Sequence, residues 1–526
     1  MRLTAVIAAL TCLLATAVSP AQETRLPDIG SSANEVLNPT KQAEYGSMML
    51  SQLRHYDYVL DDPLVDAWLQ SVGHRLAAAS DRPDHPFVFF MLKDRQFNAF
   101  ATLGGYIGTN AGLVLVAESE DEVAGVLAHE VAHVTQTHVL RSVERAQKDS
   151  VPILLAMLGA IAVAQAAGGN SADDASIAAV SSMQGLMIQR QIDYTRSNES
   201  EADRLGIQTL TRAGYDPNAM TSMFGRMQTL SRVNQGGERE RTPDYLRTHP
   251  VTTTRVSEAR SRAAELSQRA PALVPGSAIT SENPLIPASL RVQGGQRKAE
   301  NPNFGWARER IRVLSANTPV EAIREYERMR QARPLTDAQR YGLAMARARN
   351  GEYAASAREL APLLESYPDD AWIAIGIAEA EARNGQIAAA DKRLEGMLAR
   401  MPGHRAVALS YARLLAERND PEAGRRAQAV LRPLAVSAKD DPIFQKTFAR
   451  ASEVAGDPIR AGEAHAEAEY INGRPERALV QLNTLLKRED VDYYARARIE
   501  ARIASITPRV LELRRQGVRD DELRRR

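Results

Sequence analysis

The spacing of hydrophobic and polar positions changes along the chain and predicts two folded regions of different kinds. In the first, roughly 30–268, a helical pattern over 64–76 is followed by the continuous apolar run 86–92, which is short enough for a buried strand. From 306 to 505 the pattern is helical throughout. The sequence therefore predicts a mainly α protein, in which an α+β domain (22–268) precedes an α-helical domain (306–505).

Two further elements are predicted inside the first domain. Residues 98–110 (NAFATLGGYIGTN) have paired glycines beside β-favouring residues, as a hairpin or an edge strand has. Ser119 can cap a helix, and Glu122 three residues later completes a capping box. Apolar residues at helical spacing continue that helix through the segment 129–133 (HEVAH).

Prolines and glycines concentrated in 269–305 predict a linker between the two domains. In the second domain the pair Asn-Gly at 350–351 returns at 384–385, and Tyr-Pro at 367–368 is matched by Met-Pro at 401–402, each after 34 residues. This period resembles the tetratricopeptide repeat, a stack of helix pairs that bury their apolar faces on one another and leave an extended concave surface. A generic helical bundle is the alternative.

The chain is expected to begin with an export signal and to end in a charged tail (506–526). Arg2 precedes an apolar run that reaches Val18, and small residues follow. We therefore expect a cleaved signal peptide at 1–21, since a membrane anchor needs a longer run. The only cysteine, Cys12, lies in this signal, so the mature chain is expected to have no thiol for a disulfide or a metal site.

The overall composition fits a mostly helical globular protein, since 44% of the residues are hydrophobic and 25% are charged but only 5% are aromatic. Acidic and basic side chains nearly balance, with a formal net charge of +1. We therefore expect no nucleic-acid partner, because such a partner requires a concentrated basic face. The apolar segment 151–167 is marginal for spanning a bilayer. We interpret it as a buried or surface-lying helix, with peripheral membrane contact as the alternative.

The segment HEVAH carries the predicted chemistry. On an α-helix, residues four apart are offset by about 40°, so His129 and His133 project from one face and can bind one Zn²⁺ ion per chain. Glu130 lies beside the position left for water and can accept a proton as the water attacks a peptide carbonyl, then pass it to the leaving amine. Two histidines on an ordinary helix are the alternative, but H-E-x-x-H is rare in a chain with nine histidines. The sequence thus predicts a zinc metalloendopeptidase with Glu130 as its catalytic residue.

A tetrahedral zinc site needs a third protein ligand, which must come from elsewhere in the sequence. His138 is excluded because it would lie about 180° around the helix from His129. Glu199 and Asp203 are four apart at the start of another amphipathic stretch, so one can bind the metal while the other accepts a hydrogen bond from a ligand histidine. Glu201 would project away from Glu199, so we expect no ligand there. A solvated acidic helix start is the alternative.

Four segments together resemble a known family. They are NAFATLGGYIGTN, LAHEVAHVTQTH, NESEADRLG and LRTHPVTTTR. They are similar to the gluzincin family of HtpX and the CAAX-prenyl endopeptidases, and the expected export signal and repeats narrow the resemblance to its periplasmic BepA-type branch in Gram-negative bacteria. The resemblance covers about 40–260 strongly and the repeat region more weakly.

The resemblance implies roles for individual residues. Glu199 would be the third zinc ligand, and Asp203 would hydrogen-bond behind the ligands. His249 would be a fourth ligand that holds the site closed; a histidine that positions substrate or caps a loop is the alternative. Arg255 matches an arginine of the family, to which we assign a supporting role near the site.

The resemblance also implies a substrate and a setting. The strand that contains Gly104, Gly105 and Tyr106 would be the edge on which an extended substrate is laid by backbone pairing. We expect a periplasmic endopeptidase that degrades misfolded or stalled outer-membrane proteins, with the repeats docking the outer-membrane assembly machinery or its clients. A periplasmic chaperone or assembly scaffold that acts mainly through its repeats is the alternative.

Overall fold

The computed structural model describes residues 37–142, 144–145, 195–234, 245, 249–269 and 302–515. The expected signal peptide and the apolar segment 151–167 lie outside the described residues, as do almost all of the expected linker and residues 516–526 of the expected tail. None of the helices in the described part of the chain combines the length and the apolar character that spanning a bilayer requires.

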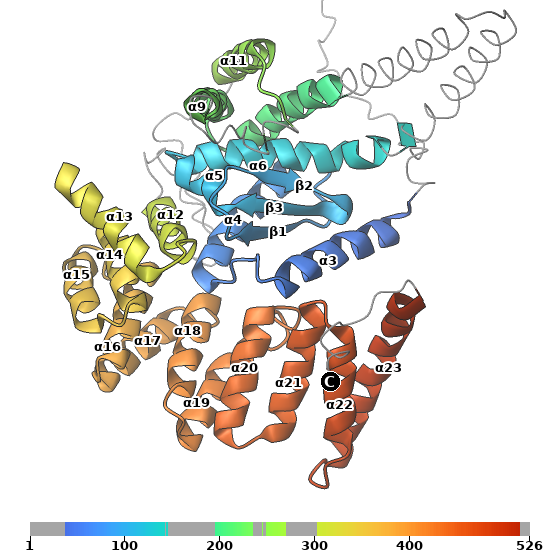
Figure 1. Ribbon diagram of the computed structural model, residues 1–526, viewed down its shortest axis with the longest axis vertical. Helices are drawn as coiled ribbons and strands as arrows, with labels where there is room; N and C mark the ends of the chain where they lie inside the picture. Colours follow the sequence, from blue (N-terminus) through green and yellow to red (C-terminus); the bar gives the residue numbers. More distant parts are fainter. Residues whose placement is uncertain are drawn as a thin grey trace, which may run out of the picture.

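The first domain is built around a three-stranded sheet (Figure 1). Its strands are β1 (Val88–Leu92), β2 (Ala99–Ala101) and β3 (Tyr106–Asn110), in the order β1-β3-β2. β3 pairs parallel with β1 and antiparallel with β2. The strand predicted within 86–92 and the hairpin predicted over 98–110 are therefore confirmed.

The glycine pair lies in the turn between β2 and β3. Leu103–Gly105 form a short 3₁₀ turn (η1), in which Gly104 and Gly105 have φ of 75° and 82°, a conformation that glycine adopts without steric cost. Tyr106 begins β3, which is paired on both sides. Gly104, Gly105 and Tyr106 therefore do not form the expected strand edge, because the strand order places an outer edge on β2 instead; their expected role in substrate binding stays a prediction.

Helices cover this sheet and carry the predicted site. α4 (Pro63–Ala79) packs against β1, and α6 (Glu120–Thr135) packs against β2 (Figure 1). The other helices discussed below are α3 (Pro39–His55), α5 (Ala111–Val116), a helix over 195–212, α9 (Ala219–Asn234) and α11 (Thr253–Arg269). α9 packs against α6, and α11 packs against α9.

The predicted start of α6 is confirmed, with one change in its hydrogen bonds. Ser119 Oγ accepts a hydrogen bond from the Glu122 N–H at 3.3 Å. The Glu122 carboxylate reaches one residue further back than a capping box requires and accepts from the Glu118 N–H at 2.7 Å. It also accepts from Arg226 of α9 at 2.9 Å, so it holds the start of α6 against a second helix.

The second domain is a stack of helices whose bounds repeat the predicted 34-residue spacing. α14 (Asp337–Arg349) and α15 (Tyr353–Ser366) recur as α16 (Ala371–Arg383) and α17 (Ile387–Arg400). Gly351 and Gly385 occupy equivalent turns, with φ of 82° and 86°. The other helices are α12 (Pro302–Leu314), α13 (Pro319–Ala332), α18 (Arg405–Ala416), α19 (Pro421–Leu431), α20 (Pro442–Ala455), α21 (Pro458–Ile471), α22 (Pro475–Leu486) and α23 (Tyr493–Arg515).

The ends of the second domain differ from the expected ones. α12 begins at Pro302, so the boundary expected at 305 falls inside a helix. α23 runs to Arg515 instead of ending near 505, because Ile506 and Val510 are buried together with Ile499 in an apolar cluster of their own. Helix packing thus extends into the expected charged tail.

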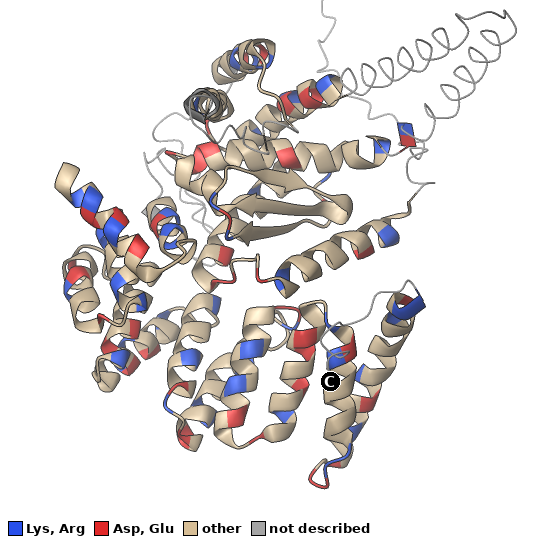
Figure 2. Ribbon diagram, in the orientation of Figure 1, with Lys and Arg blue, Asp and Glu red and all other residues tan. Residues whose placement is uncertain are grey.

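Acidic and basic side chains are interspersed over the helical stack (Figure 2). Several of them form ion pairs between a helix and the next but one along the chain, at close to the repeat spacing: Arg383–Glu417, Arg405–Asp441, Arg498–Glu463 and Arg502–Glu467. Partly exposed pairs of this kind contribute about 0–1 kcal/mol each. The buried apolar faces of the helices therefore hold the stack together, and the ion pairs add to its register.

α12 joins the two domains through a shared apolar core. Phe304 and Trp306 of α12 are buried, and the Phe304 ring lies 6.2 Å from the ring of Trp68 in α4. The same core cluster continues through the stack as far as Ala451 in α20. The repeat region is therefore fixed to the first domain, and Figure 1 shows it passing from α12 around to α22, below α3.

A buried ion pair reinforces this junction. Arg310 of α12 donates to both carboxylate oxygens of Asp62, at 2.9 and 2.8 Å, and also to the Tyr341 hydroxyl at 3.1 Å. Asp62 caps α4 as well, accepting from the N–H groups of the first turn at 3.1 Å. Burial raises the pKa of Asp62, but the charge and hydrogen bonds of Arg310 outweigh burial and hold this pKa below its usual value. Asp62 is therefore ionised and dependent on Arg310.

Arg310→Met should lower the free energy of unfolding by about 3–5 kcal/mol, because it leaves Asp62 buried without its charged partner. Equilibrium unfolding in urea measures this loss. Arg95→Gln is the matched control: Arg95 also pairs across the two domains, with Glu325 at 3.0 Å, but its side chain is 39% exposed. The control should cost less than about 1 kcal/mol, and equal losses in the two variants would contradict the assigned role of Arg310.

Candidate metal centre

Two helices supply most of the predicted site. α6 carries His129, Glu130 and His133, and the helix over 195–212 carries Glu199 and Asp203. The helices cross closely at Gly206, where a side-chain carbon would lie 3.1 Å from the backbone N and Cα of His129. A side chain here would force its neighbours to shift, so glycine favours the close approach that brings the carboxylates to the histidines.

Four side chains converge on one point. Nε2 of His129 and Nε2 of His133 are 3.0 Å apart, and the two carboxylate oxygens of Glu199 lie 3.4 Å from the first and 3.3 Å from the second. The ligand atoms of these residues and of His249 all lie within 4.8 Å of one another. Imidazole nitrogens and one carboxylate are the donor set of a catalytic zinc site, so these residues could hold a metal ion of that type.

Asp203 and Arg255 stand behind this cluster. Asp203 Oδ1 lies 3.0 Å from His129 Nδ1, within hydrogen-bonding distance. Arg255 of α11 donates to both oxygens of Asp203 at 2.7 Å, and its Nη1 lies 2.8 Å from Glu199 Oε2. Asp203 thus places an acceptor at the nitrogen of His129 that faces away from the cluster, which favours the tautomer with Nε2 free for a metal, and Arg255 balances the charge of the two buried carboxylates.

Burial and charge shift the pKa values of the ligands. Burial lowers the pKa of His129, but its contacts with Asp203 and Glu199 outweigh burial and raise this pKa to about 10. Burial, with the charge of His129, lowers the pKa of His133 to about 3. Burial raises the pKa of Glu199, yet its contacts with the three histidines hold it well below 4.5. The cluster therefore favours a positive charge at its centre, which a divalent cation can supply.

Glu130 is fully buried next to this cluster. Neither of its carboxylate oxygens has a hydrogen-bond partner among the described residues, and His249 Nε2 lies 4.0 Å from Oε1. Burying a carboxylate without a donor is costly. Such a cost is expected where the group must stay free to take up a proton during a reaction.

His249 completes the cluster from a third segment. Its Nδ1 lies 2.8 Å from Glu199 Oε1. Its ring lies 4.6 Å from the ring of Tyr245, whose carbonyl accepts the His249 N–H at 2.7 Å. Tyr245 was not predicted as a site residue; its offset of four residues from His249 is the only sequence signal that places the two side by side.

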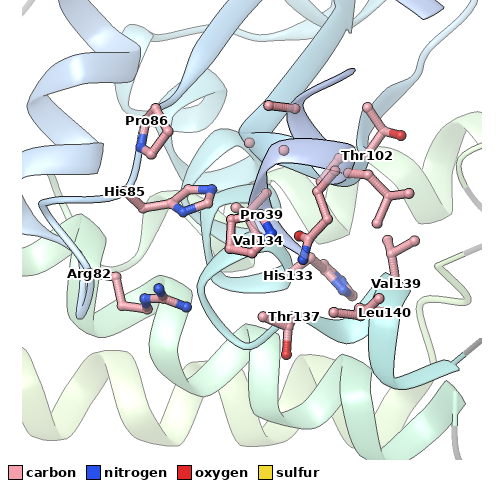
Figure 3. A pocket seen from close by; sticks show the side chains of 16 residues that line it. Pro39, Arg82, His85, Pro86, Thr102, His133, Val134, Thr137, Val139 and Leu140 are labelled. Carbon is pink, nitrogen blue, oxygen red and sulfur yellow. The ribbon is translucent and has the colours of Figure 1, made fainter. Parts of the chain in front are cut away.

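A cavity of about 120 Å³ opens beside His133 (Figure 3). Gly104 and Gly105 line it, together with apolar side chains such as Val134 and Leu140. The predicted glycines therefore belong to the surroundings of the site, although they lie in a turn and not on a strand edge.

His138 and Glu201, which were not expected to be metal ligands, contact the site from behind His133. His138 Nδ1 lies 2.9 Å from His133 Nδ1, and His138 Nε2 lies 3.1 Å from Glu201 Oε2. The position expected for His138, on the far side of a continuous helix, is wrong because α6 ends at Thr135 and the chain turns back. The sequence signal for His138 is its position as the third histidine of H-E-x-x-H-x-x-x-x-H. On an unbroken helix this spacing would not place it beside His133.

Two histidines four apart on one helix, with a glutamate between them and a carboxylate from a second helix, define the centre of a metallopeptidase. Residues 63–263 match the sequence model of peptidase family M48. The chain therefore contains a peptidase domain of the M48 type over these residues.

Three relatives show a likeness of different extents. The chain is 42% identical to a putative beta-barrel assembly-enhancing protease of Vibrio cholerae over 238 residues, which are 45% of this chain and 47% of that protein. It is 28% identical to the beta-barrel assembly-enhancing protease of Yersinia pestis over 484 residues, 92% of each chain. For the protein of that name in Escherichia coli K12 the identity is 30% over 347 residues, 66% of this chain and 64% of that one. The alignments thus range from about half to nearly all of the relatives' length.

Arg255→Gln should lower the free energy of unfolding of the metal-free protein by about 3–5 kcal/mol, because two buried carboxylates lose their shared partner. Arg255→Lys should not restore it, since an ammonium group cannot reproduce the forked contact. Arg262→Gln, on the same helix, removes the partly exposed pair with Glu258 at 2.9 Å and should cost less than about 1 kcal/mol. Urea unfolding in a metal chelator measures all three; a restored stability in Arg255→Lys would contradict the argument.

Proposed function

We propose that this protein is a zinc-dependent endopeptidase of the periplasm that cleaves misfolded or stalled outer-membrane proteins. The observation that carries the enzymatic part is the buried, unpartnered carboxylate of Glu130 beside the cluster of His129, His133 and Glu199. The substrate class is supported by the relatives that are named beta-barrel assembly-enhancing proteases, because proteins of this barrel type are assembled in the outer membrane of Gram-negative bacteria. The predicted export signal supports the periplasm.

In this proposal His129, His133 and Glu199 hold one zinc ion. When bound, zinc supplies a Lewis acid and lowers the pKa of water toward neutrality. Glu130 accepts the proton of the attacking water at a carboxylate oxygen and returns it to the leaving amine. Because Glu130 has no other hydrogen-bond partner among the described residues, no competing donor holds its carboxylate away from that proton.

β2 offers a backbone edge for an extended substrate. The Thr102 N–H donates to the Tyr106 carbonyl at 2.9 Å, so the alternation of an antiparallel pair turns the N–H and C=O groups of Ala99 and Ala101 away from β3. β2 packs against α6. A peptide that pairs with this edge therefore lies along the helix that carries Glu130.

His249 restrains this activity in our proposal. Its imidazole lies within reach of the point that the other three ligands share and 4.0 Å from Glu130. A ligand there takes the position that water needs. Release of His249, for example when the repeats engage a client, would then open the site. The competing function is a scaffold that acts through its repeats alone. That function does not explain why the carboxylate of Glu130 is buried without a hydrogen-bond partner among the described residues.

Glu130→Gln should reduce the cleavage of an unfolded protein such as casein by about 10²–10⁴-fold, the contribution of a general acid–base group. Zinc content should stay at one ion per chain, because Glu130 is not a ligand. Glu265→Gln, on the exposed part of α11, is the control and should keep full activity. Retained proteolysis in Glu130→Gln would sink the mechanism, and full biological function without proteolysis would favour the scaffold.

His249→Ala should raise the initial rate of zinc-dependent cleavage. If the closed arrangement holds nine-tenths of the molecules, its loss increases the rate about tenfold. His249→Asn, which shortens the side chain but keeps a polar group, should give an increase of the same sign. Rates that fall, with a higher KM, would instead assign His249 to substrate positioning.

A further inference from the structure

A chain of hydrogen-bonding groups leads from His133 to the helix that carries Glu199. His133 Nδ1 faces His138 Nδ1 at 2.9 Å, and His138 Nε2 faces Glu201 Oε2 at 3.1 Å. The His138 side chain is only 3% exposed. Arg141 lies 3.2 Å from the same oxygen of Glu201, so Glu201 is held in place from a second side.

The backbone makes an unusual turn to place His138 there. α6 ends at Thr135, and Thr137 has a φ of 53°, in the left-handed region. A β-branched residue adopts this conformation at a cost of about 1–3 kcal/mol. The turn brings His138 back against His133, whose ring lies 4.8 Å away. An unfavourable backbone conformation next to a ligand indicates a positional requirement.

The chemistry of the three groups fixes the direction of their hydrogen bonds. An ionised Glu201 only accepts, so His138 Nε2 must carry the proton. In a neutral imidazole one nitrogen donates and the other accepts, so Nδ1 of His138 is then the acceptor. His133 Nδ1 must then donate, which leaves the lone pair of its Nε2 free and directed toward Glu199, 3.3 Å away.

A carboxylate also orients His129, in this case directly and without a second histidine between them. Asp203 Oδ1 lies 3.0 Å from His129 Nδ1 and only accepts. Glu201 and Asp203 are two residues apart on the helix over 195–212. One helix turn therefore supplies the ligand Glu199 and the two carboxylates that orient the two ligand histidines, one directly and one through His138.

We propose that His138 and Glu201 are positioning residues, which hold His133 in the tautomer and orientation that bind the metal. The inference rests on the proposed zinc site. Neither residue touches the ion or the substrate; both act through His133. The pair therefore sets how tightly the metal is held.

The test measures the zinc dissociation constant of the full mature chain by competition with a coloured chelator. His138→Leu should weaken zinc binding by about 10- to 100-fold, as the loss of a group that orients a metal ligand does. Glu201→Ala should weaken it by a smaller factor in the same direction, because His138 remains but is no longer directed. The visible absorption spectrum of the cobalt-substituted protein should also change in both variants, since the His133 ring is freed to rotate.

Two variants separate positioning from general damage. His138→Asn puts a carboxamide oxygen where the imidazole has Nδ1, so zinc binding should lie between those of wild type and His138→Leu. Glu258→Ala removes another carboxylate that contacts the same helix, through Ser200 at 3.2 Å, but no ligand histidine; zinc binding should not change. Thermal unfolding of the metal-free proteins shows whether each variant folds.

Two results together overturn the inference. A folded His138→Leu would bind zinc as tightly as the wild type, and Glu201→Ala would lose no more zinc affinity than Glu258→Ala. If His138→Leu does not fold, Glu201→Ala and the cobalt spectrum decide alone. Failure of the wild-type protein to bind one zinc ion would instead overturn the proposed function, so the two failures are distinct.

Discussion

The close contact between α6 and the helix over 195–212 is the constraint on which the site depends. Glycine at 206 lets the backbone of one helix approach His129 on the other. That approach brings Glu199 and Asp203 to the two histidines, and Arg255 from a third helix balances the charge of these two carboxylates. Removing Arg255 would leave two buried carboxylates without their shared partner, at a cost that far exceeds that of an exposed ion pair. Metal binding and folding are therefore linked in this domain.

Among the described residues, the repeat region contacts this domain at places that lie far apart in the sequence. At one, α12 shares the apolar core and the Asp62–Arg310 pair. At another, the turn after α21 contacts α3: Ser51 donates to the Ile471 carbonyl at 3.4 Å, and Arg474 donates to His55 at 2.9 Å. α3 also packs against η1, the turn that lines the cavity beside His133. A force on the repeats can thus reach the site through packed helices, without a disulfide, since the only cysteine of the chain is Cys12.

Local sequence patterns predicted well where helices, strands and turns lie, but they predicted poorly which other elements those segments contact. Ser119 marked the start of α6, the glycine pair marked the hairpin, and the Asn-Gly pairs marked turns at a spacing that the helix bounds repeat. The errors share one cause. The edge assigned to Gly104–Tyr106, the domain end near 505 and the far-side position of His138 each depended on partners that are distant in the sequence or on where a helix stops.

The sequence by itself determined the chemistry of α6, because the i, i+4 offset of His129 and His133 is a property of any α-helix. It also limited the third ligand to a small acidic segment, with help from a family resemblance. Only the tertiary structure decided how that segment is used: Glu199 lies in the cluster, Asp203 behind His129, and Glu201 behind His138. Spacing along one helix cannot show this, since each carboxylate takes its role from the group that faces it on a different helix.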